Sequence, residues 1–226
     1  NAILTTGGQL SVADVDGADS FVVQTGVAGD NGLGTFSIDA DGTWSYSTNT
    51  AHNEFVGGQT YTDSVTVTAA DGTSQVLTVT ITGDNDAPSL TGIAATLNNG
   101  TEDTAYTVSA ADLLRGYSDI DGGTPAIGTL SADHGSIVDN GNGTFTITPA
   151  ADYNGTLTLS YTVVDGQGGS TPATQSITIG AVNDAAVITG PTTADLTETN
   201  AILTTGGQLS VADVDGACLL YTSRRG

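Results

Sequence analysis

Apolar and polar residues alternate along short segments of the chain. In residues 1–83 this pattern covers residues 36–38, 65–67 and 77–81, where apolar side chains are separated by Ser or Thr. Successive side chains of a strand point to opposite faces, so the alternation predicts strands with one buried face. Asp41-Gly42 and Asp71-Gly72 lie between such segments and favour tight hairpin turns.

The same alternation returns in residues 144–148, 157–163 and 176–179. Helical periodicity is lacking, although residues 109–116 are expected to form one short helical turn. About seven short strands in each hundred residues predict an all-β fold of two-sheet sandwiches with Greek-key connections.

Two short acidic connectors divide the chain. Residues 83–88 read GDNDAP, and a weaker version, GAVNDA, occupies residues 180–185 without a counterpart of Asp84. Each follows a β-rich segment of about the length of a domain. The predicted division is residues 1–83 as a first sandwich, residues 84–88 as an acidic linker, residues 89–182 as a second sandwich, and residues 183–217 as the start of a third domain.

An exact internal repeat supports this division. Residues 1–18 recur without change at residues 200–217. Eighteen identical positions point to a parent chain that repeats a unit of two domains. By this interpretation residue 1 falls inside a domain whose opening strand is missing. Residues 218–226 contain Cys218 and two of the three arginines and break the pattern, so they are interpreted as an artefactual tail.

Charge and composition argue against some classes of binding partner. Residues 1–217 hold all 25 acidic residues and a single arginine. Nucleic acid and anionic membranes require a basic surface and are therefore not expected as partners. No apolar run is long enough to cross a membrane, so no membrane insertion is predicted. With one cysteine, an intrachain disulfide is impossible, which leaves bound metal as a source of stability.

Paired aspartates recur in the sequence pattern Asp-x-Asp-Gly. In an extended chain, residues two apart face the same side, so both carboxylates can bind one Ca²⁺ ion. Such a pair alone is also ordinary turn chemistry, and that alternative stays open. If the sandwiches stack, a connector, the next pair and a late-hairpin aspartate would meet at one junction. The candidate calcium ligands from this reasoning are Asp84, Asn85, Asp86, Asp119, Asp121, Asp165, Asp14, Asp16, Asp71, Asn183, Asp184, Asp213 and Asp215.

Longer motifs carry a family resemblance. The segment DGTSQVLTVTITGDNDAP, with DGTWSYS before it, resembles VCBS repeats of large bacterial RTX-type surface adhesins. Residues 101–186, from TEDTAYTVSAADLLRGYSDIDGG to VNDAA, resemble the cadherin-like repeats that alternate with them. The resemblance implies tandem immunoglobulin/cadherin-like β-sandwiches, Ca²⁺ at the junctions, type I secretion, a bacterial cell-surface location, and roles in adhesion and biofilm formation. It also implies that Glu102 serves the second junction. Because the second connector has neither a proline nor a counterpart of Asp84, that junction should be the weaker one.

Signs of catalysis are missing from the sequence. His52 and His134 have no partner at metal-ligand spacing, and no nucleophile motif occurs, so no enzyme is predicted. Trp44 shares a strand face with Tyr46 and is expected in the core rather than in a sugar-binding platform. The alternatives are an accessory or glycan-binding module of a secreted enzyme, or homophilic adhesion through the sandwich faces. If the chain is a spacer instead, its partners are neighbouring repeats of the same chain, and cell-surface or glycan ligands would be bound through other domains.

Overall fold

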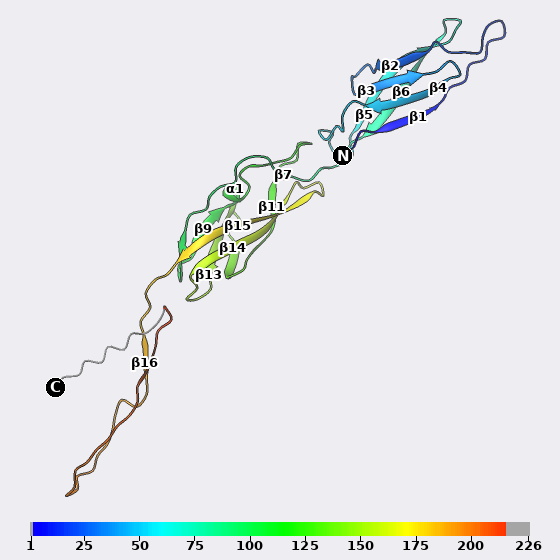
Figure 1. The fold of residues 1–226 in the computed structure, drawn as a ribbon. Coiled ribbons are helices and arrows are strands. Elements are labelled where there is room, and N and C mark those ends of the chain that lie inside the picture. Colours follow the sequence, from blue (N-terminus) through cyan, green and yellow to red (C-terminus); the bar gives the residue numbers. More distant parts are fainter. Residues whose placement is uncertain (1, 216–226) are drawn as a thin grey trace. The chain divides into compact units, whose positions relative to one another are not determined.

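The computed structural model describes residues 2–215, and its elements are almost entirely strands (Figure 1). The all-β prediction is thus confirmed. Six strands form the first sandwich. They are β1 (Thr5–Gln9), β2 (Gln24–Ala28), β3 (Gly34–Ile38), β4 (Thr43–Thr48), β5 (Thr60–Thr68) and β6 (Ser74–Thr82).

These strands make two sheets, in the orders β1-β4-β3-β2 and β5-β6, with antiparallel neighbours throughout. The alternating apolar residues of both sheets form one core, which includes Phe36, Tyr46, Val67 and Ile81. Trp44 lies half-buried at the margin of this core. Burial of one face of each sheet explains the period-two sequence pattern.

A buried carboxylate anchors the turn between β2 and β3. Asp63 on β5 is fully buried and accepts hydrogen bonds from the amides of Asn31, Leu33 and Gly34, at 2.9, 3.2 and 3.0 Å. The hydroxyl of Tyr46 donates a further bond at 3.1 Å. Burial, together with the Asp63 charge, raises the pKa of Tyr46 to about 12, so this hydroxyl keeps its proton.

A second set of strands follows the first connector. Its members are β7 (Ser89–Leu90), β8 (Gly100–Thr101), β9 (Tyr106–Ser109), β10 (Tyr117–Ser118), β11 (Ala126–Ala132), β12 (Gly135–Asp139), β13 (Thr144–Pro149), β14 (Gly155–Val164) and β15 (Ser170–Gly180). The main sheets have the orders β11-β14-β15-β8 and β12-β13-β9, and β7 pairs with β10. The chain crosses between the sheets from β11 to β12 and from β13 to β14, whereas β12 and β13 are neighbours in one sheet and β14 and β15 are neighbours in the other.

Buried side chains again come from both sheets, on β9 and β13 of one and on β14 and β15 of the other. The expected helical turn is α1 (Ala110–Leu113), where the Ser109 hydroxyl accepts a bond from the Asp112 amide as an N-cap. Leu113 is fully buried, and its carbonyl accepts a bond from the Tyr161 hydroxyl at 2.8 Å. No helix within residues 2–215 has the length and apolar character of a membrane span.

The remaining described chain forms one two-stranded ladder. β16 (Val187–Thr189) pairs with β17 (Ser210–Ala212), antiparallel. The repeat segment at residues 200–215 therefore has a different structure from residues 2–16, where β1 lies in a four-stranded sheet. The predicted tail at residues 218–226 and Cys218 lie outside the described residues.

Packing divides the chain into two compact units. Among the described residues, the first contains residues 2–94, 116–128 and 162–171, and the second contains residues 95–115, 129–161 and 172–215. The first connector thus packs in one unit with the loops that carry Asp119, Asp121 and Asp165. The second connector belongs to the other unit, together with Glu102.

Candidate metal sites at the two connectors

The first connector begins against a loop of the first sandwich. The Gly83 amide donates to the carbonyl of Gln59 at 2.8 Å, and the Gly83 carbonyl accepts from Gly58 at 2.9 Å. A Cβ atom at Gly83 would lie 2.3 Å from the Val56 carbonyl oxygen, so only glycine fits. Gly83 thereby fixes the position at which Asp84, Asn85 and Asp86 leave the sheet.

Two of those residues reach the loops at Asp121 and Asp165. The Asn85 side-chain amide donates to Asp165 at 2.7 Å, and the Asp86 main-chain amide donates to Asp121 at 3.1 Å. Within the Asp-x-Asp pair, the Asp121 amide donates to the Asp119 carboxylate at 3.2 Å. The structure therefore gathers five of the predicted ligands around the connector, whereas Asp84 is exposed beside them.

Several oxygens at this place are buried and have no hydrogen-bond partner. They are Oδ1 of Asn85, Oδ2 of Asp119 and Oδ1 of Asp121. A buried polar atom without a partner costs about 1–3 kcal/mol, so native proteins rarely leave one unpaired. Three acceptors in one group, two of them carboxylate oxygens, are suited to a hard cation.

The carboxylates of this group also influence one another's ionisation. Burial raises the pKa of Asp119, and the side-chain contact and charge of Asp121 and the charge of Asp165 act in the same direction. The hydrogen bond from Asn85 lowers the pKa of Asp165, helped by the amides of Gln167, Gly168 and Gly169. The Asp165 carboxylate is thus held ionised, whereas the Asp119 carboxylate resists ionisation.

The second connector repeats these hydrogen bonds. The Asp184 amide donates to Asp215, and the Asp215 amide donates to Asp213 at 3.1 Å. The Asn183 side-chain amide bonds the Asp184 carbonyl at 2.8 Å, as Asn85 bonds the Asp86 carbonyl at 3.2 Å. The same local geometry therefore forms from two different sequences, DND and VND.

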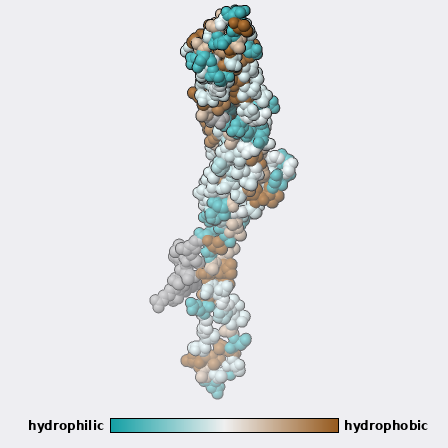
Figure 2. All heavy atoms as spheres, turned by 90° about the vertical axis from the view of Figure 1, so that its right-hand side faces the viewer, coloured by the Kyte–Doolittle hydropathy of each residue, from teal (hydrophilic) through white to brown (hydrophobic). Residues whose placement is uncertain are grey.

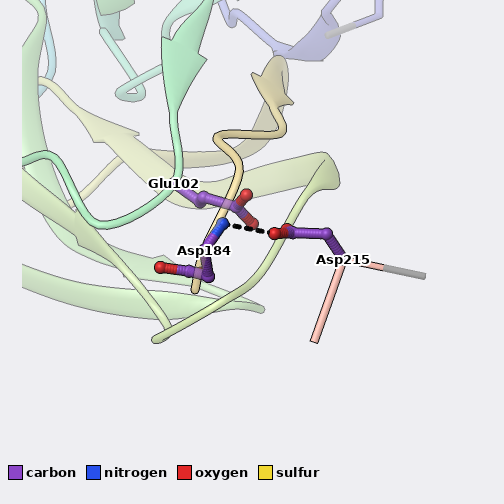
Figure 3. Close-up of side chains that lie close together, drawn as sticks. All are labelled: Glu102, Asp184 and Asp215. Atoms are coloured by element: carbon purple, nitrogen blue, oxygen red, sulfur yellow. Dashed lines mark hydrogen bonds between the residues drawn. The ribbon is translucent and has the colours of Figure 1, made fainter. Parts of the chain in front are cut away.

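A buried glutamate is added at the second connector. Glu102 is 1% exposed, and its Oε1 accepts a bond from the Val182 amide. Figure 3 shows its carboxylate directed toward Asp184 and Asp215, and single oxygens of these three residues lie within 4.8 Å of one another. Asp103, Asp152 and Asp184 form a second group of the same kind. Within residues 2–215, three-carboxylate groups this tight occur only here.

Asp184 belongs to both groups of three carboxylates, and the other members influence its pKa. Burial raises its pKa, and so do the charges of Asp215, Asp152, Asp103 and Glu102. Its Oδ2 is buried without a hydrogen-bond partner. A divalent cation would convert this repulsion into attraction, because every neighbouring charge has the same sign.

Other predicted ligands form local turns instead. Asp14 accepts from the Asp16 amide at 3.0 Å, and Asp71 accepts from the Thr73 amide at 2.8 Å within the hairpin between β5 and β6. Among the described residues, Asp14, Asp16 and Asp71 join no group of three metal-binding side chains. Here the structure shows turn chemistry, the alternative that the sequence left open.

Asp152 was not among the predicted ligands. It is a solitary acid in the loop between β13 and β14, with a positive φ of 56°. Its amide donates to Asp103 at 3.2 Å, a contact between residues 49 positions apart. Nothing local in the sequence marks such a residue, because its role depends on the pairing of distant strands.

The side chains at each of the two connectors fit a hard divalent cation. Carboxylate, amide and main-chain oxygens are the ligands such a cation takes, and buried unpaired oxygens are present at each connector. At the first connector Asn85, Asp119 and Asp121 would hold it, and at the second Glu102, Asp184 and Asp215. The cation would supply charge neutralisation and cross-linking of segments that are distant in sequence.

Two family models match the chain, and together they cover most of it. Residues 2–83 match the bacterial Ig domain, and residues 84–180 match the cadherin-like domain. The boundary between the matches falls at the first connector. A search of curated proteins finds no match.

Solved structures give distant similarities. Protocadherin gammaB7 EC3-6 has 16% identity and a TM-score of 0.43, over 80% of this chain and 45% of that chain. Protocadherin Gamma B2 extracellular cadherin domains 3-6 has 15% identity and a TM-score of 0.39, over 91% and 51%. The endo-fucoidan hydrolase MfFcnA4 from glycoside hydrolase family 107 has 18% identity and a TM-score of 0.31, over 80% and 24%.

The chain spans between a quarter and about half of the length of these three structures. Its two matched segments lie side by side in the sequence, and each ends where an acidic connector begins or continues. Residues 2–83 are therefore similar to the bacterial Ig domain, and residues 84–180 are similar to the cadherin-like domain.

Proposed function

We propose that this chain is a calcium-stiffened structural segment of a secreted bacterial surface adhesin, in which it separates or presents an adhesive part elsewhere in the protein. The observation that carries the proposal is the repetition of one hydrogen-bonded geometry at both connectors. In each, a main-chain amide of the connector bonds the second aspartate of an Asp-x-Asp pair. A geometry that recurs at two domain boundaries supports a role at the boundary rather than in one domain.

Calcium is the cation that these ligands suit best. It accepts six to eight oxygens in flexible arrangements, whereas Mg²⁺ requires a tighter octahedron and keeps its waters. The carboxylate and amide oxygens come from loops of differing length, which favours the more tolerant ion. Extracellular calcium is also abundant enough for sites of modest affinity, so a surface location accords with this choice.

A non-catalytic role is part of the proposal. The unusual ionisation at the connectors belongs to carboxylates that would bind a cation, and hydrogen bonding accounts for that of Asp165. Trp44, the single tryptophan, is half-buried against the first core and is a poor candidate for a sugar-stacking platform. Both features suit a spacer better than a glycan-binding module.

Thermal unfolding of the full chain in Ca²⁺ and in chelator tests the proposal. A ligand that binds the native state alone stabilises it, by about 2.7 kcal/mol at a hundred times its dissociation constant. We expect the unfolding midpoint to rise with Ca²⁺ concentration and to return when chelator is added. A midpoint that is unchanged across millimolar Ca²⁺ would contradict the proposal.

A further inference from the structure

The single histidine of the first sandwich lies between two hydrogen-bond acceptors. His52 belongs to the loop between β4 and β5, and its side chain is 9% exposed. Its Nδ1 lies 2.7 Å from Oε1 of Glu54, and its Nε2 lies 2.9 Å from the carbonyl oxygen of Leu33. The hydrogen bond from His52 lowers the pKa of Glu54, which is therefore ionised near neutral pH. Both ring nitrogens thus face groups that only accept hydrogen bonds.

These two acceptors favour the protonated form of the ring. A neutral imidazole has one N–H and donates to one of the two acceptors, whereas an imidazolium donates to both. Burial opposes the positive charge of His52, but the hydrogen bonds to Glu54 and Leu33 outweigh it. Together with the charges of Glu54 and Asp63, they raise the pKa of His52 above its ordinary value of 6.5.

Aromatic contacts hold the ring through its face. The ring of His52 stacks on Phe55 with 4.6 Å between the centroids, and Phe55 stacks on Tyr61 of β5 at 3.8 Å. A cation over an aromatic face is attracted by the negative charge of that face. The main chain of His52 has a φ of 48°, a conformation that is unfavourable for a residue with a side chain and that such contacts must hold. The ring therefore links its loop to the core.

His52 bonds the same turn that Asp63 anchors. Leu33 lies in the turn between β2 and β3, where its amide donates to Asp63 at 3.2 Å and its carbonyl faces the ring of His52. Farther along the loop of His52, the Gln59 carbonyl accepts a bond from the amide of Gly83 at the start of the first connector. The loop that carries the histidine therefore contacts both this turn and the beginning of the connector.

Acidic groups surround this histidine. Residues 1–83 contain no lysine or arginine, and His52 is the only histidine among them. The strongly hydrophilic side chains visible on the first sandwich, at the top of Figure 2, are therefore acids and amides apart from that histidine. A proton on His52 is thus the one positive side-chain charge that the first sandwich can acquire. The titratable groups around it are Glu54 on its own loop, Asp63 and Tyr61 on β5, and Asp84, which lines the same cavity.

We propose that His52 is a proton-dependent switch that controls the stability of the first sandwich. With the proton bound, His52 ties its loop to the turn between β2 and β3, and without the proton one of its two hydrogen bonds is lost. Because the pKa of His52 is raised, this stabilisation is complete below the pKa of an unfolded histidine and is lost as the pH rises through the folded pKa. No metal takes part in this switch, so it is independent of calcium binding.

Titration of the histidine rings by nuclear magnetic resonance, on the full chain in chelator, tests the proton site directly. We expect His52 to titrate at a higher pH than it does in the same chain unfolded in urea. Glu54→Gln should lower the pKa of His52, because the amide oxygen that replaces the carboxylate has no charge. His134→Gln distinguishes the resonances of the two histidines. A His52 ring that titrates at or below its unfolded pKa would overturn the inference, and this result needs no variant to fold.

Urea unfolding in chelator, followed by the fluorescence of Trp44, measures the effect on stability. Between about pH 6 and pH 8 the folding equilibrium constant should fall by about tenfold for each unit by which the folded pKa of His52 exceeds its unfolded pKa. His52→Asn should lose this dependence on pH, since asparagine tolerates the left-handed main chain but does not bind a proton.

His134→Gln is the matched control and should keep the pH dependence of the parent. The α-amino group titrates in the same range, but the parent and both variants share it. The same pH dependence in the parent and in His52→Asn would overturn the inference, because another group would then bind the proton. Neither result depends on Ca²⁺, so failure of this inference would leave the proposed function standing.

Discussion

The two oxygens of the Asp119 carboxylate have different surroundings. Its Oδ1 accepts the Asp121 amide, whereas its Oδ2 is buried and unpaired. Its raised pKa means that the metal-free fold binds a proton there more tightly than the unfolded chain does. That stabilisation is present below the ordinary pKa of an aspartate and is lost as the pH rises through the folded pKa.

We therefore expect Asp119→Asn to have effects of opposite sign. Asparagine keeps the acceptor for the Asp121 amide and removes the charge. In chelator at neutral pH the variant should unfold at a higher temperature than the parent, and this difference should vanish as the pH falls below about 4. In Ca²⁺ its affinity should be lower by about tenfold or more.

Calorimetric titration and thermal unfolding over this pH range provide the measurement. Asp195→Asn, at an exposed acid, is the control and should change neither quantity. A variant that is destabilised in chelator would show that the charge of Asp119 is already compensated in the metal-free fold.

At this scale the sequence predicted the Asp-x-Asp pairs and the connector residues as candidates. Asp119 and Asp121 follow a connector in the sequence and meet it in the structure, whereas Asp14 and Asp16 have no connector before them and form a local turn. The two pairs have the same local pattern, and their difference arises from segments far away in the chain. Asp63 and Asp152 gave no signal at all for the same reason.

Among the elements, the turn between β2 and β3 depends on a residue of another sheet. Asp63 on β5 accepts three amides of this turn and the Tyr46 hydroxyl while it is fully buried. The first sandwich thus has a polar link between its two sheets in addition to its apolar core. Such a network stabilises only when all its members are present.

We expect Asp63→Ala to destabilise the first sandwich by about 3 kcal/mol or more, because several buried donors lose their acceptor together. Chemical denaturation followed by Trp44 fluorescence reports on this sandwich. Asp39→Ala removes the same charge at an exposed position and should have little effect. Equal losses in the two variants would assign the effect to net charge instead of the network.

The period-two pattern predicted the strands of both sandwiches well, because one buried face is a local property of a strand. The pairing of those strands was not predictable in the same way. The parallel contact of β8 with β15 joins residues about eighty positions apart, and β8 has only two residues. A segment that short has no pattern of its own.

At the scale of the whole molecule, the effect of bound Ca²⁺ must be separated from the general effect of salt on a highly charged chain. The formal net charge is −22, so any salt relieves repulsion among exposed acids. Bound Ca²⁺ should do more, since it cross-links the connector to the loops at Asp121 and Asp165. We expect it to narrow the distribution of distances between the two domains.

Spin labels at Ser45→Cys and Ser136→Cys, in a Cys218→Ser background, measure this distribution by pulsed electron resonance. Both label positions are exposed. The distribution should be narrower in Ca²⁺ than in chelator with NaCl at the same ionic strength. Equal widths under the two conditions would mean that calcium binds without stiffening the junction.

The parallel pairing of β8 with β15 has a mechanical consequence. These are the strands near the beginning and the end of the second sandwich, so tension applied along the chain pulls them in opposite directions. Their hydrogen bonds are then loaded together, in shear, and must break at once rather than one after another. Glu102 lies at the end of this short clamp, and a cation bound there would add its own attraction to the same resisting contact.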